Sequence, residues 1–83
     1  MSRPIASVYA EDKRTDGHTD IRIECESGLK AKAAAFDIRK VSSGNDVGVT
    51  ANVVYALVRY ANYEAALDAT FLALDRAGWD VRC

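Results

Sequence analysis

The sequence predicts an α+β fold in which a three-stranded antiparallel meander precedes two helices. Residues 5–26 alternate between apolar and polar side chains, which is typical of strands buried on one face. Two turn signals, Asp16-Gly17 and Glu26-Ser27-Gly28, interrupt this pattern. Residues 50–78 contain no proline, have their only glycine at the end and are rich in large apolar side chains. These features favour a hairpin-rich first half and a helical second half.

The first two strands are expected at residues 5–13 and 19–26. Proline at position 4 suits the start of a strand, where no ladder donor is needed. The Asp16-Gly17 pair suits a type I′ turn, because both central residues need a positive φ. The predicted core face of the second strand carries Ile21, Ile23 and Cys25.

Charge complementarity suggests a register for this hairpin. A two-residue turn places Lys13 opposite Asp20 and Glu11 opposite Arg22, and both pairs have opposite charges. The matching core-face pairs are Ala10 with Ile23 and Val8 with Cys25. A slip of one residue would expose every apolar side chain, so we expect this register.

Residues 29–41 are expected to form the third strand. Lys30 and Lys32 then lie on its outer face, and Phe36 lies on its inner face after a phase change that a β-bulge in the alanine run explains. A short helix at Ala31–Phe36 is the alternative, because alanine is the best helix former. We favour the bulged strand, since residues 36–41 look extended.

Two helices are expected at residues 50–61 and 63–77, with Thr50 and Asn62 as N-caps and Gly78 as the C-cap. A single helix over residues 50–77 is the alternative. Residues 79–82 alternate again and are compatible with a short fourth strand. On a helical wheel, residues 50–77 carry a second apolar stripe made up of Val54, Val58, Ala61, Ala65, Ala69 and Leu72. This stripe predicts that the chain bends at Asn62 and buries the stripe, or that a partner covers it, which includes a second copy of the chain.

Length and charge narrow the class of protein. The chain has 83 residues, which suits one small domain spanning 1–83. It has 11 basic and 12 acidic residues, so it lacks the basic surplus typical of nucleic-acid binders. No apolar run is long enough for a membrane span, and no signal peptide is recognisable. We therefore expect a cytoplasmic protein.

The residues with reactive side chains form no recognisable catalytic set. His18 is the single histidine and is expected in a turn. Cys25 fits the alternation of a core strand, and Cys83 is terminal; free thiols are favoured over a disulfide. No phosphate-binding or metal-ligand motif occurs. The sequence thus predicts a non-enzymatic protein without a cofactor or metal.

The best candidate for a protein-interaction surface is an acidic row on the last helix. Glu64, Asp68 and Asp75 lie on one flank, with the apolar Leu72 beside them. Tyrosines at 55, 60 and 63 are a second candidate. One alternative function, nucleic-acid binding, would use the basic sheet face of Lys30, Lys32 and Arg39, although direct binding is not the expected mode. The other alternative is a homodimeric structural module that covers the second apolar stripe.

The small size, the hairpin signals and the acidic flank at Glu64–Asp75 give the chain a resemblance to small inhibitor proteins of phages and mobile elements, among them anti-CRISPR proteins. The resemblance is one of type, and no residue role is carried over from it. It implies a stoichiometric inhibitor or adaptor that docks on a protein complex, such as a CRISPR effector complex. Such an inhibitor would block binding of target DNA or a conformational step.

Overall fold

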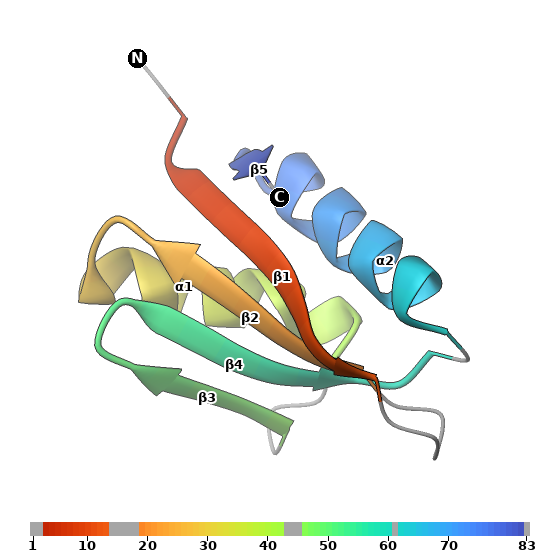
Figure 1. Cartoon of the computed structure of the whole chain (residues 1–83). Helices are drawn as coiled ribbons and strands as arrows, with labels where there is room; N and C mark the ends of the chain where they lie inside the picture. Colours follow the sequence, from red (N-terminus) through yellow and green to blue (C-terminus); the bar gives the residue numbers. More distant parts are fainter. Residues whose placement is uncertain (1–2, 14–18, 43–45, 61, 83) are drawn as a thin grey trace.

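A computed structural model describes residues 3–13, 19–42, 46–60 and 62–82. It is an α+β fold with a five-stranded mixed sheet, one face of which is covered by two helices (Figure 1). The elements in chain order are β1 (Ile5–Lys13), β2 (Thr19–Cys25), α1 (Gly28–Asp37), the 3-10 turn η1 (Ile38–Lys40), β3 (Val47–Thr50), β4 (Val53–Val58), α2 (Tyr63–Arg76) and β5 (Asp80–Arg82). The expected Asp16-Gly17 turn, His18 and Cys83 lie outside the described residues.

The strand order in the sheet is β3-β4-β2-β1-β5. Because β2 is antiparallel to both β1 and β4, β4 runs in the same direction as β1, and β5 is parallel to β1. The chain therefore crosses from β4 to β5 past two intervening strands. Helix α2 makes this crossover, on the face of the sheet that also carries α1 (Figure 1).

The β1–β2 hairpin exists, but its predicted register is wrong by two residues. Arg22 is opposite Tyr9 instead of Glu11, and Ile23 is opposite Val8 instead of Ala10. The ladder shifts between Ala10 and Asp12, so an extra residue enters β1 near the turn. A shift of two residues keeps the same side chains on the core face, which is why the alternation alone could not exclude it.

The predicted strand at residues 29–41 is wrong, because this segment is helix α1 followed by η1. The Glu26-Ser27-Gly28 segment begins a helix, and the Ser27 hydroxyl caps it by accepting a hydrogen bond from Lys30 N at 3.2 Å. Three side chains at helical spacing, Ala31, Ala34 and Ile38, are fully buried against the sheet. The alternative of a short helix in the alanine run was the better interpretation.

The predicted helix at residues 50–61 is also wrong, because these residues contribute to β3, a tight turn and β4. Val54, Ala56 and Val58 are buried and alternate with more exposed residues. Valine and tyrosine favour a pleated, half-buried strand. Strand β4 occupies the place next to β2 that the meander assigned to residues 29–41.

The second predicted helix is confirmed as α2, and the short terminal strand is confirmed as β5. The Asn62 side chain accepts a hydrogen bond from Ala65 N at 2.8 Å and caps the helix. The C-cap residue is Ala77, one position earlier than predicted; Gly78 directly follows it, and its φ of +99° favours glycine there. The single helix over residues 50–77 is excluded. The second apolar stripe consequently does not exist as one face, because Val54 and Val58 are core residues of β4 while Leu72 is exposed on α2.

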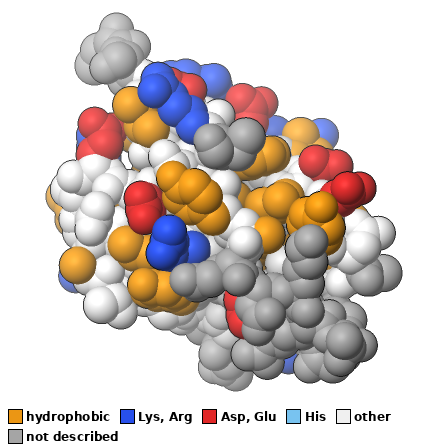
Figure 2. Space-filling model, viewed as in Figure 1, with side chains coloured by type: hydrophobic (Ala, Val, Ile, Leu, Met, Phe, Trp, Pro, Cys, Tyr) orange, Lys and Arg blue, Asp and Glu red, His pale blue; other side chains and the backbone are white. Residues whose placement is uncertain are grey.

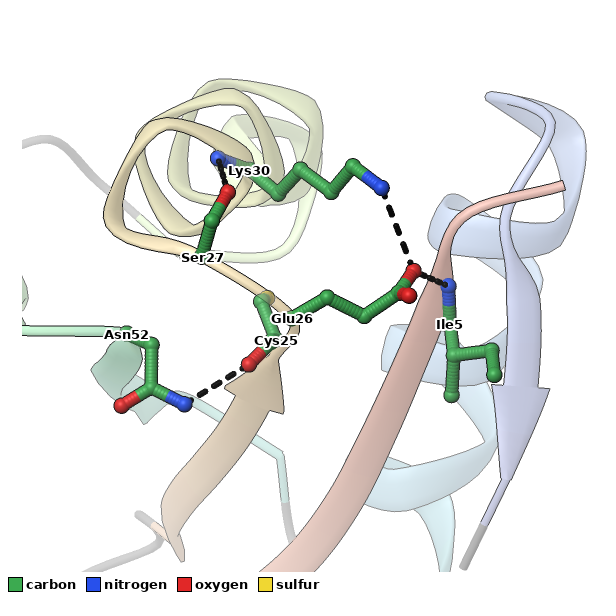
Figure 3. Close-up of polar contacts among 6 residues, drawn as sticks. All are labelled: Ile5, Cys25, Glu26, Ser27, Lys30 and Asn52. Atoms are coloured by element: carbon green, nitrogen blue, oxygen red, sulfur yellow. Dashed lines mark hydrogen bonds and ion pairs between the residues drawn. The ribbon is translucent and has the colours of Figure 1, made fainter.

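Polar contacts fix the start of α1 to both neighbouring strands (Figure 3). The Glu26 carboxylate accepts hydrogen bonds from Ile5 N at 3.0 Å and from Lys30 Nζ at 3.3 Å. On the other side of β2, Cys25 N donates to Asn52 O at 2.9 Å, and Asn52 Nδ2 donates to Cys25 O at 2.7 Å. These contacts hold β1, β2 and the β3–β4 turn around the first turn of α1.

The core lies between the sheet and the two helices. Its largest fully buried apolar side chains come from β1, β2, β4, η1 and α2: Val8, Ile21, Ile23, Ile38, Val54, Val58 and Leu74. The buried Trp79, just before β5, donates its indole N–H to the Asp37 carboxylate at 2.7 Å. This hydrogen bond joins the segment after α2 to the end of α1.

Candidate protein-interaction surfaces

The structure brings together three of the four residues predicted as a protein-contact face. Asp68, Leu72 and Asp75 line a shallow hollow of about 500 Å³ between α2 and β5, together with Phe71, Val81 and Arg82. We call this the acidic hollow. Glu64 does not line this hollow. It lies in the first turn of α2, where the helix dipole stabilises a carboxylate.

Most charges at the acidic hollow have partners within the chain. Asp75 forms an ion pair with Arg3 at 3.5 Å, and Arg82 forms one with Asp80 at 3.0 Å. All four side chains are well exposed, so each pair contributes little stability. The pairs nevertheless reduce the local negative charge that a partner would meet. Asp68 is then the one lining carboxylate without an ion pair among the described residues.

A second depression lies on the other side of Leu72, between α2 and the end of α1. It encloses about 480 Å³, and its most prominent lining residues are Phe36, Arg39, Lys40, Tyr60, Leu72 and Arg76. We call it the basic groove. Leu72 is thus the ridge between two hollows of different charge.

The position of Phe36 follows from the buried face of α1. Because Ala31, Ala34 and Ile38 face the sheet, the side chains on the opposite side of the helix point away from the protein. Leu29 and Phe36 lie there and are 81% and 65% exposed. The sequence prediction placed Phe36 inside a strand core, and this was wrong. Reading the alanine run as a helix would have revealed the exposed apolar face.

Cations surround the apolar part of the basic groove. The Arg39 guanidinium lies 5.1 Å from the centre of the Phe36 ring, a distance suited to a cation–π contact. Arg39, Lys40 and Arg76 form no ion pair with any carboxylate among the described residues. All three cations lie in the last turn of η1 or α2, where a positive charge interacts favourably with the helix dipole.

The basic sheet face predicted for nucleic-acid binding is not present. Lys30, Lys32 and Arg39 lie on α1 and η1 instead of on the sheet. Lys30 forms an ion pair with Glu26 at 3.3 Å and lines a polar hollow with Arg3, whereas Arg39 lines the basic groove. The three cations therefore do not form one surface.

The outer face of the sheet carries a row of two tyrosines and an arginine and is not covered by a helix (Figure 1). Arg22 lies between Tyr9 and Tyr55 in the strand register, and its guanidinium is 5.2 Å from the centre of the Tyr9 ring. Arg22 also pairs with Glu24 at 3.4 Å. Figure 2 shows hydrophobic side chains among both acidic and basic ones on this face. Its charge is therefore mixed, in contrast to the basic groove.

The described reactive side chains give no sign of a metal site or an activated nucleophile. Burial raises the pKa of the Cys25 thiol, and the neighbouring Glu26 carboxylate raises it further. The thiol is thus held protonated in the core near neutral pH. Among the residues that the structure describes, no group of three or more His, Cys, Asp or Glu side chains is placed to hold a metal ion. The described helices include none long and apolar enough to span a membrane.

Comparisons with known proteins add no functional information. No family model matches the chain, and neither a curated protein nor a solved structure is significantly similar to it.

Proposed function

We propose that this chain is a non-enzymatic protein-binding module that acts as an inhibitor or adaptor in the cytoplasm. The observation that carries the proposal is the gathering of exposed apolar side chains around one groove. Phe36, Tyr60 and Leu72 are 65%, 37% and 49% exposed, and all three line the basic groove. An apolar patch with a charged rim is typical of a protein-contact surface.

The way α1 packs on the sheet leaves apolar side chains in water, which is unfavourable in free energy unless a partner covers them. Phe36 and Leu29 lie on the side of α1 opposite its buried alanines, and no element that the structure describes covers them. Exposing a large apolar side chain forgoes about 1.5–3 kcal/mol relative to full burial. A partner that covers Phe36 and Leu72 would recover part of this free energy, and aromatic side chains are frequent energetic centres of interfaces.

The proposed mechanism is stoichiometric docking on a larger protein complex. A CRISPR effector complex remains our proposal for the kind of target, on the basis of the resemblance in size and type to small phage inhibitors. Leu72 belongs to the predicted contact face of Asp68 and Asp75 and also to the basic groove. A partner that docks on Leu72 could therefore contact α2 at the acidic hollow or at the basic groove.

Affinity capture from the source cells tests the proposal. Tagged wild-type protein should retain a protein partner in a fixed stoichiometric ratio, and Leu72→Ser should lose it while remaining folded by circular dichroism. Tyr9→Ser is the matched control, because Tyr9 is similarly exposed but lies on the outer sheet face. Capture of the same partner at the same ratio by Leu72→Ser would contradict the proposal, as would the absence of any stoichiometric partner.

A further inference from the structure

We infer that the basic groove binds an acidic segment of the partner protein, which inserts a bulky apolar side chain between Phe36, Tyr60 and Leu72. The inference rests on the proposed function and specifies the chemistry of the partner. It follows from three features of the groove: cations that form no ion pair among the described residues, an apolar interior, and the poor fit of other occupants.

The cations of the groove differ from most of the other cations that the structure describes. Arg3, Lys30, Arg59 and Arg82 each form an ion pair with a carboxylate of this chain. The three cations that line the groove form none among the described residues, and they come from two different elements. Cations that converge on one hollow without carboxylate partners produce a positive potential there, which attracts an anionic partner.

The groove holds one carboxylate of its own, which does not neutralise these cations by direct contact. Asp37 accepts the indole N–H of the buried Trp79 at 2.7 Å, so its orientation is fixed toward the core. With three cations and one anion among its lining residues, the groove is positive, although the whole chain has a net charge of −1. The positive charge is therefore a local property of this surface.

The apolar part of the groove has room for a side chain of a partner. Ala69, Leu72, Ala73 and Arg76 follow one another at the spacing of a single face of α2. The two alanines are small, and the larger Phe36, Tyr60 and Leu72 also line the depression. A volume of about 480 Å³ lies within the range of ligand pockets. It is large enough for an anchoring leucine or aromatic side chain.

A second copy of this chain is a poor occupant. Self-complementary pairing through the groove would bring Arg39, Lys40 and Arg76 close to the same cations of the other copy. Pairing of the groove with the acidic hollow of another copy would require Asp75 to exchange its own ion pair with Arg3. Such head-to-tail contact would also leave one groove open in every assembly that does not close into a ring.

A nucleic acid is also a poor occupant. Its phosphates form an extended track, and binding usually requires several cations along that track. Here the cations surround one hollow, and Asp68 and Asp75 lie on the other side of Leu72. A short acidic segment fits the local positive charge without meeting these carboxylates.

Selection from a phage-displayed library of random peptides tests the inference, with the full chain as the immobilised target. We expect the enriched sequences to contain several Asp or Glu residues around a bulky apolar residue. Phe36→Ala should weaken binding of the enriched peptides by at least about tenfold. Enriched sequences rich in Lys or Arg, sequences without a charge bias, or no enrichment at all would each overturn the inference.

Charge variants locate the binding site of the selected peptides. Arg76→Gln should weaken their binding by about three- to tenfold. Lys32→Gln is the matched control, because Lys32 is an exposed cation without an ion pair among the described residues that does not line the groove. Equal weakening by the two variants, with both folded to the same extent, would contradict binding in the groove.

Two further arms separate the inference from the proposed function. Short single-stranded and duplex oligonucleotides are titrated against the chain; binding that Arg39→Gln abolishes would assign the groove to nucleic acid and overturn the inference. The captured partner is examined independently. If its capture depends on Leu72 but it competes with no acidic peptide, the proposed function stands and the inference fails.

Discussion

The two sides of Leu72 present opposite electrostatic situations on a single helix. On the acidic side, Asp75 pairs with Arg3, and Arg82 pairs with Asp80. On the basic side, Arg39, Lys40 and Arg76 pair with no carboxylate of the described residues. Both sides contain apolar side chains, but only the basic side contains one as exposed as Phe36.

This difference shows that the charge of isolated residues is a poor guide to an interaction surface. The acidic row is conspicuous in the sequence because its members share one helix. The basic groove becomes visible only after α1, η1 and α2 are placed together. Within the described part of the chain, the groove is distinguished by cations that pair with no carboxylate and by apolar side chains that no element covers.

The largest effect is expected from Trp79, because it anchors the groove to the core. Trp79→Ala should lower the free energy of unfolding by about 3–5 kcal/mol, through the lost burial and the cavity that remains. The unpaired Asp37 carboxylate would add to the loss. Denaturant titration followed by circular dichroism measures this change.

Asp37→Asn is the milder test of the same contact. The amide keeps an oxygen that can accept the indole N–H, so we expect a loss of about 1 kcal/mol or less. The basic groove would also become more positive, and an acidic peptide should then bind more tightly. Weaker binding to a folded Asp37→Asn variant would contradict the assigned polarity of the groove.

Binding should depend on Phe36 far more than stability does. Phe36→Ser should weaken binding of the partner by about tenfold or more, because an aromatic anchor is lost. The free energy of unfolding should change by less than about 1 kcal/mol, since the side chain is largely exposed. Isothermal titration calorimetry and denaturant titration measure the two quantities.

Charge reversal on each side of Leu72 compares the two hollows directly. We expect Lys40→Glu to weaken binding of the partner by about three- to tenfold, and Asp68→Lys to change it by less than about threefold. Salt should reduce the wild-type affinity but have less effect on Lys40→Glu. Abolished binding in Asp68→Lys, together with unchanged binding in Lys40→Glu, would assign the interaction to the acidic hollow.

The smallest expected effect is the pH dependence of stability that comes from Glu26. In contrast to the groove cations, the Glu26 carboxylate has hydrogen-bond and charge partners within the chain. The hydrogen bond from Ile5 N, followed by the hydrogen bond and charge of Lys30, lowers the pKa of Glu26. The folded state therefore prefers the ionised form more than the unfolded state does. The resulting stability is present above the unfolded-state pKa and is lost as the pH falls through the folded-state pKa.

Thermal unfolding across the acidic pH range tests this prediction. Glu26→Gln should make the decrease in Tm with falling pH shallower than in the wild type. Glu24→Gln is the control, because Glu24 lies on β2 two residues before Glu26 and faces the outer side of the sheet. Identical pH profiles for the wild type and Glu26→Gln would contradict the assigned role of Glu26.

The α+β class, the first two strands, α2 and β5 could be predicted because their local patterns fit one period. Residues 21–25 fit only the strand alternation, and Asn62 and Gly78 mark the ends of α2. The alanine run fitted both the two-residue period of a strand and the 3.6-residue period of a helix, since an alanine side chain can be buried or exposed equally well. Residues 53–58 were ambiguous as well: Val53, Ala56 and Leu57 suit a helix, whereas Val54, Ala56 and Val58 suit a strand. Pairing with β2 decided in favour of the strand.

The candidate site was only partly predictable for the same reason. Leu72 was identified from its position on the confirmed helix. Phe36 was assigned to the core because its segment was assigned to a strand, and Arg39 and Arg76 are far apart in the sequence. Their convergence depends on the crossing of α1 and α2 over the sheet, which no local pattern encodes.

The most direct test of the account is nuclear magnetic resonance mapping of a selected acidic peptide on the ¹⁵N-labelled chain. We expect the largest amide shift changes at the basic groove, around Phe36, Arg39 and Ala73. Little change is expected at Val81 beside the acidic hollow or at Tyr9 on the outer sheet face. Shift changes centred on Val81 or Tyr9, with those at Phe36 and Ala73 unchanged, would contradict it.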